Sequence, residues 1–70
     1  MKAYNLNHLA SNLKKLRKQA ELSREQLAKK AKVNYNTIIK VESGANKNPT
    51  IKTLLGFAQV FKKSVDDLIR

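Results

Sequence analysis

Apolar residues recur three or four positions apart along most of this chain, with polar residues between them. This spacing is typical of amphipathic α-helices. Breaks in the pattern and the capping residues beside them predict five helices, at about residues 8–20, 23–31, 34–43 and 50–61, and from Ser64 to the end of the chain. We find no segment with the strict alternation of a β-strand, so the predicted fold class is all-α.

The first and fourth predicted helices carry the longest apolar stripes. The stripe of the first helix consists of Leu6, Leu9, Leu13, Leu16 and Ala20. The stripe of the fourth helix consists of Ile51, Leu54, Leu55, Ala58 and Phe61, with Phe57 alongside. Gly56 lies inside the fourth helix, where it costs about 1 kcal/mol relative to alanine. Close approach of another backbone would explain a glycine there.

The stretch from Ser23 to Gly44 contains two short helices joined by a short turn. Ser23 and Gln26 have the spacing of a capping box, and Asn34 is a good N-cap for the second helix. Gly44 suits the left-handed position that often ends a helix.

The two short helices share an apolar seam, formed by Leu27, Ala28, Ala31, Val33, Ile38 and Val41. The second helix keeps a polar and basic outer face. Such a pair is what a helix-turn-helix requires, and its second helix is narrow enough to enter the major groove of DNA, about 12 Å wide.

Composition agrees with a nucleic-acid partner. The chain has 70 residues, which predicts one small domain, and its net charge of +10 comes from 15 Lys and Arg against 5 Asp and Glu. It has no cysteine, and its apolar runs are far shorter than the ~20 residues that span a bilayer. There is no apolar signal region at the N-terminus, so we expect a cytoplasmic protein without membrane contact.

Three segments together resemble the phage repressor/Cro-type (XRE) family: LSREQLAKKAKVNYNTIIKVESG, Asn48-Pro49-Thr50 and SVDDLI. The resemblance covers roughly residues 9–69. It implies a compact five-helix, lambda-repressor-like DNA-binding domain over residues 1–70, whose helices 2 and 3 form the helix-turn-helix. Residues 1–5 are polar, and residues 1–7 are expected to form a loosely ordered arm.

The resemblance also implies which residues contact DNA. Base contacts carried over by position are Tyr35, Asn36 and Lys40, and Ile39 lies on the same outer face, where it can touch a thymine methyl. The phosphate contacts are Arg24, Asn46 and Lys47, with Thr37 and Asn12 as weaker candidates. Arg17 and Glu42 match a structural ion pair that ties helix 1 to helix 3.

The chain departs from the family at Glu21, Lys32 and Lys62, where relatives usually have glycine. Left-handed geometry at these positions would cost a non-glycine residue roughly 1 kcal/mol. Lys63 replaces a residue that is usually apolar, which argues against a dimer seam on the last helix.

The predicted function is a sequence-specific regulator that binds double-stranded DNA, and more narrowly a repressor that acts by occupying its operator. We expect a homodimer on an inverted repeat, with half-sites about 34 Å apart. The alternative is a protein-interaction, adaptor or antitoxin-like module, which an exposed apolar patch on Val65 and Ile69 would favour.

An enzyme is not expected, and neither is a cofactor or metal. His8 and five acids are the available groups, without metal-ligand spacing or a nucleophile–base pair.

Overall fold

The computed structural model describes residues 8–70, which form five α-helices and contain no β-strand. The helices are α1 (Leu9–Gln19), α2 (Arg24–Ala31), α3 (Tyr35–Ser43), α4 (Ile51–Phe61) and α5 (Val65–Ile69). The prediction of an all-α fold is confirmed, and the helix bounds differ from those expected by one residue. The predicted arm at residues 1–7 lies outside the described residues, as does Leu6.

Side-chain caps explain where four of these helices begin. The cap residues are Ser23, Asn34, Thr50 and Ser64, and each accepts a hydrogen bond from a backbone N–H in the first turn. The capping box predicted for α2 is complete: Ser23 Oγ accepts from the Gln26 N–H at 3.0 Å, and Gln26 Oε1 accepts from the Ser23 N–H at 2.8 Å. These bonds satisfy donors that a helix cannot pair internally.

Helix α5 has a second capping box, between Ser64 and Asp67. The Ser64 N–H donates to Asp67 Oδ2 at 3.2 Å, and the Asp67 N–H donates to Ser64 Oγ at 3.0 Å. The hydrogen bond from the Ser64 backbone N–H, and after it the interaction with the Ser64 hydroxyl, holds the pKa of the Asp67 carboxyl below its ordinary value. Asp67 therefore has a structural role at the start of α5.

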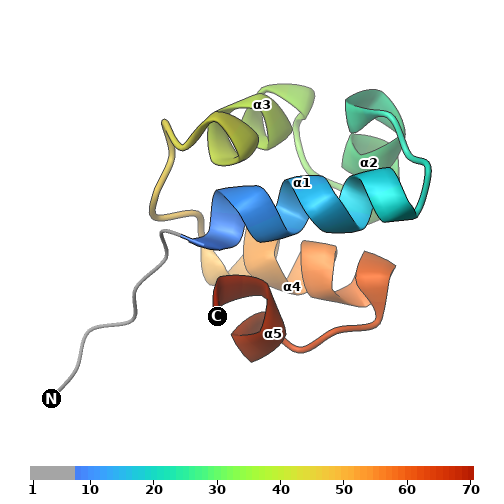
Figure 1. The fold of residues 1–70 in the computed structure, drawn as a ribbon. Helices are drawn as coiled ribbons and strands as arrows, with labels where there is room; N and C mark the ends of the chain where they lie inside the picture. Colours follow the sequence, from blue (N-terminus) through green and yellow to red (C-terminus); the bar gives the residue numbers. More distant parts are fainter. Residues whose placement is uncertain (1–7) are drawn as a thin grey trace, which may run out of the picture.

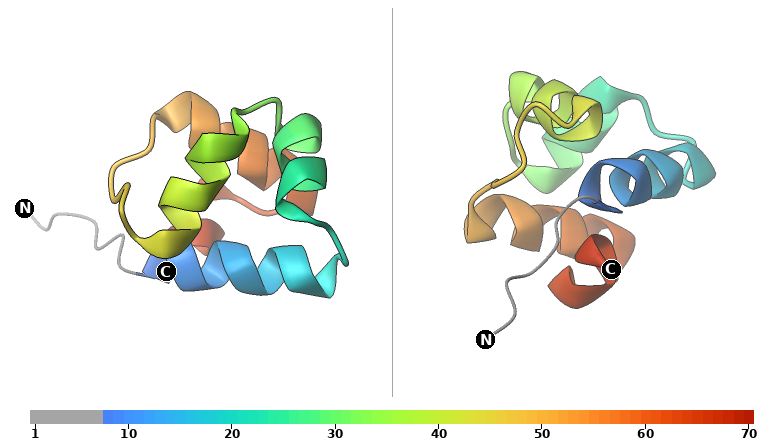
Figure 2. Two further views of the ribbon diagram at one scale, coloured as in Figure 1. Left: turned by 90° about the horizontal axis from the view of Figure 1, so that it is seen from above. Right: turned by 60° about the vertical axis from the view of Figure 1, so that its left-hand side comes forward.

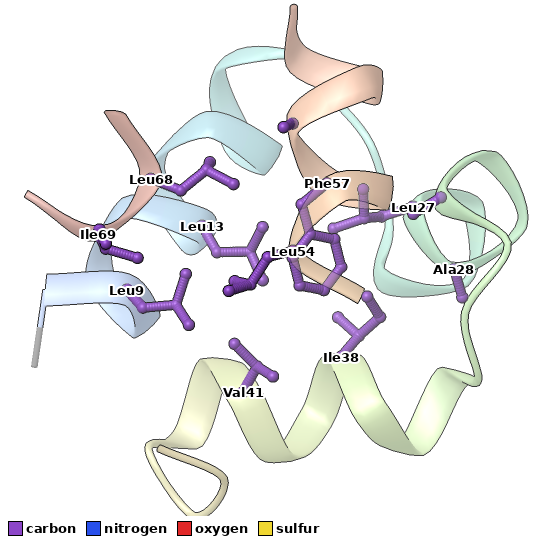
Figure 3. Close-up of a cluster of buried hydrophobic side chains, with 12 residues drawn as sticks. Leu9, Leu13, Leu27, Ala28, Ile38, Val41, Leu54, Phe57, Leu68 and Ile69 are labelled. Carbon is purple, nitrogen blue, oxygen red and sulfur yellow. The ribbon is translucent and has the colours of Figure 1, made fainter. Parts of the chain in front are cut away.

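In Figure 1, α2 and α3 lie above α1, and α4 and α5 lie below it. Helix α1 packs on α3 and α5, whereas α2 packs directly on α3 and α4. The turned view on the right of Figure 2 keeps α3 and α5 at opposite sides of the molecule. The most deeply buried side chains come from all five helices and meet in one cluster (Figure 3): Leu9, Leu13, Leu27, Ile38, Val41, Phe57 and Leu68.

The predicted stripe of α4 is partly wrong. Ile51 and Leu55 are 65% and 55% exposed, whereas Phe57 is fully buried between Leu54 and Ala58. A helix buries only a stripe of limited width on its surface. In α4 this stripe is centred near Phe57, and not on the line from Ile51 to Leu55 that the sequence suggested. Ile51 and Leu55 are therefore left at its solvent edge. Ala20, also assigned to a stripe, is exposed beyond the end of α1.

The apolar patch considered on α5 does not form. Ile69 is only 9% exposed, and Val65 is half-buried against the core. These residues face inward because the five-residue α5 packs on both α1 and α4.

Gly56 is explained by the close approach of α2 to α4. A Cβ atom built at this position would lie 2.6 Å from the carbonyl oxygen of Ala31, which is backbone and cannot rotate away. The glycine therefore permits the contact that holds α2, the first helix of the motif, against the core.

Gly56→Ala is expected to lower the free energy of unfolding by about 1–3 kcal/mol, because crowding in a packed interface outweighs the better helix propensity of alanine. Urea unfolding followed by circular dichroism measures this. The control is Gln59→Ala on the exposed side of α4, with an expected change within about 0.5 kcal/mol. A Gly56→Ala protein more stable than the original would show that the two backbones are not held at this distance.

Three turns carry backbone strain. Glu21, Lys32 and Lys62 have φ angles of 57°, 58° and 55°, in the left-handed region. Lys32 and Lys62 occupy the C-cap positions that end α2 and α4. The chain thus adopts left-handed geometry at the three positions where the family resemblance implied glycine.

Lys62→Gly is expected to raise the free energy of unfolding by about 0.5–1 kcal/mol. Glycine removes the strain of the left-handed conformation, and this gain is partly offset because glycine gives the unfolded chain more conformational entropy. Thermal unfolding measures the gain. Lys63→Gly removes the same charge one residue later, where φ is not positive, and is expected to destabilise the domain. Equal shifts for the two variants would mean that charge, rather than strain, is being measured.

Candidate nucleic-acid interface

Helix α3 presents one face to the core and another to solvent. Ile38 and Val41 are at most 1% exposed and point toward α1 and α4 in Figure 3. The solvent face consists of Tyr35, Asn36, Ile39 and Lys40, all of them exposed. We call this set the outer face of α3. Because α3 lies at one side of the molecule, opposite α5 (Figure 2), this face is open to a large partner.

The outer face carries groups suited to reading base edges. Among residues 8–70, the side-chain amide of Asn36 has no hydrogen-bond partner, although its backbone N–H donates to Asn34 Oδ1 at 3.0 Å. A free amide of this kind can pair with adenine N6 and N7, and a lysine ammonium can donate to guanine O6 and N7. Tyr35 and Ile39 are 44% and 36% exposed, so both offer apolar surface.

A buried ion pair fixes the position of α3 relative to α1. Arg17 Nε donates to Glu42 Oε2 at 2.6 Å and Arg17 Nη2 donates to Glu42 Oε1 at 3.2 Å. Arg17 Nη1 donates to the carbonyl oxygen of Leu22 at 2.8 Å. The side chains of Arg17 and Glu42 are 10% and 2% exposed. The two residues named from the sequence are thus brought together, and the fork-like geometry resists rotation of α3.

Glu42 also binds a second arginine, which the sequence did not reveal. Arg24 Nε donates to Glu42 Oε1 at 3.0 Å, while the Arg24 side chain remains 45% exposed. Arg24 is the first residue of α2, so this contact joins the two helices of the motif. The capping pattern predicts from the sequence that α2 begins at Arg24. It does not reveal the contact with Glu42, which lies 18 residues further along the chain.

The loop after α3 holds the next two candidate phosphate contacts. The Asn46 N–H donates to the carbonyl oxygen of Lys40 at 2.9 Å, and Asn46 Oδ1 accepts from the Asn48 N–H at 3.0 Å. Its side-chain NH₂ therefore remains available as a donor, next to the exposed Lys47. Thr37 is half-buried on the flank of α3.

Asn12 belongs elsewhere in the fold. Its side-chain amide donates to the carbonyl oxygens of Leu68 and Arg70, both at 2.9 Å. Both amide hydrogens are thus used to hold the end of α5, on the side of α1 away from α3 (Figure 1). We therefore remove Asn12 from the phosphate contacts. Its place between Leu9 and Leu16 on the apolar stripe was the signal for this role.

Two further observations concern other kinds of site. Within residues 8–70, no three side chains of His, Cys, Asp or Glu gather closely enough to hold a metal ion. Helices of sufficient length and hydropathy to cross a bilayer are absent from the same part of the chain.

Comparison with protein families gives a direct result. The helix-turn-helix family model matches residues 13–68, which include all of α2, α3 and α4. The chain belongs to this helix-turn-helix family. The match supports a DNA-binding transcription regulator of the XRE type, in which α2 and α3 are the two helices of the helix-turn-helix motif.

Solved structures of this family resemble the chain closely. The N-terminal DNA-binding domain of SinR from Bacillus subtilis has a TM-score of 0.85 and 29% sequence identity, over 89% of this chain and 90% of that one. SinR, described as a master regulator for biofilm formation, in complex with DNA has a TM-score of 0.84 and 29% identity, over 89% and 98%.

A transcriptional regulator from Listeria innocua has a TM-score of 0.76 and 34% identity, over 87% of this chain and 56% of that one. No curated protein sequence gives a significant match.

Proposed function

We propose that this chain binds double-stranded DNA in a sequence-specific manner, with α3 in the major groove. The observation that carries the proposal is the outer face of α3, where Asn36 and Lys40 are exposed on a helix whose opposite face is anchored in the core. Support comes from the structural likeness to SinR, which has been solved in complex with DNA. A net charge of +10 favours the approach to a polyanion.

Each exposed group has a role in this proposal. Asn36 and Lys40 read base edges, Ile39 contacts a thymine methyl, and Tyr35 packs against a base or the sugar–phosphate backbone. Arg24, Asn46 and Lys47 contact phosphates, and Thr37 adds a hydroxyl donor at the flank of α3. The phosphate contacts set the register of the helix in the groove, and the base contacts select the sequence.

We further propose that the chain represses transcription by occupying an operator as a homodimer. A recognition helix of nine residues spans only a few base pairs, so one copy selects a short half-site. Two copies related by a two-fold axis would read an inverted repeat whose half-sites are centred one helical turn apart, about 34–36 Å.

The repressor proposal is tested by transcription in vitro from a promoter that overlaps an operator obtained by selection. Added protein should reduce the transcript, and an insertion of five base pairs between the half-sites should abolish both repression and tight binding. The insertion moves one half-site to the opposite face of the duplex. Repression that survives the insertion would contradict simultaneous binding by two copies.

A protein-interaction module is a second candidate, because Ile51 and Leu55 leave apolar surface exposed on α4. In that function, DNA binding would be secondary. The chain would then bind duplexes of all sequences alike, and alanine at Asn36 would leave affinity unchanged.

A further inference from the structure

We infer that Glu42 is a positioning residue for DNA binding, because it holds the Arg24 guanidinium ready for a DNA phosphate beside the recognition helix. This inference rests on the proposed function. It assigns to Glu42 a second task besides its buried pair with Arg17, and it explains why an acidic residue stands on the helix that enters the groove.

The geometry of Arg24 supports this role. Its Nε donates to Glu42 Oε1 at 3.0 Å, which uses one of its five N–H donors. Within residues 8–70 the Nη groups of Arg24 have no partner, and 45% of its side chain is exposed. The carboxylate thus anchors the inner edge of the guanidinium while its outer edge remains free to bind a phosphate in a bidentate manner.

Charge distribution points the same way. Two guanidinium groups share one carboxylate, so the cluster of Arg17, Arg24 and Glu42 carries a net charge of +1. Arg17 makes two bonds to the carboxylate and is buried, whereas Arg24 makes one bond and is exposed. The uncompensated positive charge is therefore presented to solvent at Arg24.

The position of Arg24 matches the expected course of the DNA backbone. In helix-turn-helix complexes, the recognition helix lies in the major groove and the preceding helix crosses the backbone. Arg24 is the first residue of that preceding helix, and its anchor lies on α3 itself. Contact with Glu42 thereby reduces the freedom that a long side chain would otherwise lose on binding.

The first test measures DNA affinity as a function of salt for the original protein, Arg24→Gln, Arg24→Lys and the control Lys30→Gln. Lys30 is exposed on α2, so its substitution removes the same charge without touching the cluster. Arg24→Gln is expected to weaken binding about tenfold on all duplexes and to reduce the salt slope by about one. Lys30→Gln should change affinity less than about twofold.

Arg24→Lys separates position from charge. It should keep most of the salt slope but still bind DNA several-fold more weakly. A lysine ammonium cannot bind Glu42 with one edge and a phosphate with another, as a guanidinium can. Arg24→Lys binding as tightly as the original protein, or Arg24→Gln behaving like Lys30→Gln, would overturn the inference. Failure of the original protein to bind DNA at all would instead overturn the proposed function.

The second test places Glu42→Gln in a double-mutant cycle with Arg24→Gln, at a temperature where circular dichroism shows both proteins folded. Without the carboxylate, the affinity lost through Arg24→Gln should shrink at least threefold. An unchanged loss would show that Glu42 does not act through Arg24. Where Glu42→Gln does not fold, the Arg24→Lys comparison decides the question alone.

Discussion

Replacing Glu42 with alanine is expected to lower the free energy of unfolding by about 3–5 kcal/mol, the cost of breaking a buried ion pair from one side. The substitution leaves the Arg17 guanidinium, only 10% exposed, without its carboxylate. A chain of this length has a total stability of roughly 4–10 kcal/mol, at about 0.05–0.15 kcal/mol per residue. The variant should therefore lose about a third or more of the total stability, which thermal unfolding will show as a large drop in Tm.

The two arginines that share Glu42 provide the matched comparison. Arg17→Ala should be nearly as damaging as Glu42→Ala, because it leaves the buried carboxylate with only the single bond from Arg24 and removes the bond to the Leu22 carbonyl. Arg24→Ala should cost no more than about 1 kcal/mol in the free protein, since the Arg24 side chain is 45% exposed and Glu42 keeps both bonds from Arg17. Similar losses for Arg17→Ala and Arg24→Ala would contradict the assignment of the buried pair as the structural one.

Asn36→Ala is expected to weaken binding to the selected operator by about 1–3 kcal/mol, or roughly 5- to 150-fold, and to relax the preference at one base pair. The physical reason is the loss of a bidentate partner for a base. The fold should be unaffected, because the Asn36 side chain makes no hydrogen bond within residues 8–70. Titration of operator variants by fluorescence anisotropy measures both effects.

Gln59→Ala is the control for the DNA measurement. It removes a side-chain amide of the same chemistry from the exposed side of α4, and should leave affinity and sequence preference unchanged. If Asn36→Ala lowered affinity equally on every duplex, the Asn36 amide would contact the sugar–phosphate backbone of the DNA and not a base. The assignment of Asn36 to base readout would then be wrong.

Local signals made most of the fold predictable. The starts of α2, α3, α4 and α5 follow from capping residues whose partners lie two or three positions away, so the sequence contains both members of each bond. Apolar spacing then placed Leu9 and Leu13 of α1, and Ile38 and Val41 of α3, on inward faces. These are short-range properties that a periodic pattern records directly.

Features that depend on distant neighbours were harder to predict. The rotation of α4, which exposes Leu55 and buries Phe57, is decided by the helices packed against it rather than by its own spacing. Asn12 lies beside the apolar stripe of α1, but its partner in α5, 56 residues along the chain, is known only once the two helices are placed together. The contact of Arg24 with Glu42 likewise requires the arrangement of α2 on α3.

The strained turns show what family resemblance adds. Lys32 alone would not predict a left-handed residue, because a side chain disfavours that conformation. Resemblance to relatives with glycine at this position indicated the geometry, and the structure adopts it with a φ of 58°. The turn between α2 and α3 therefore has its left-handed geometry at a lysine, at a local cost in stability.

The most direct test of DNA recognition through α3 is selection from a random duplex library at two salt concentrations, followed by sequencing of the bound pool. We predict enrichment of a short inverted repeat and a steep loss of affinity at the higher salt, because base contacts select the sequence while phosphate contacts supply much of the binding energy. Salt-sensitive binding without any enriched sequence would contradict the account, since charge alone would then hold the protein on DNA.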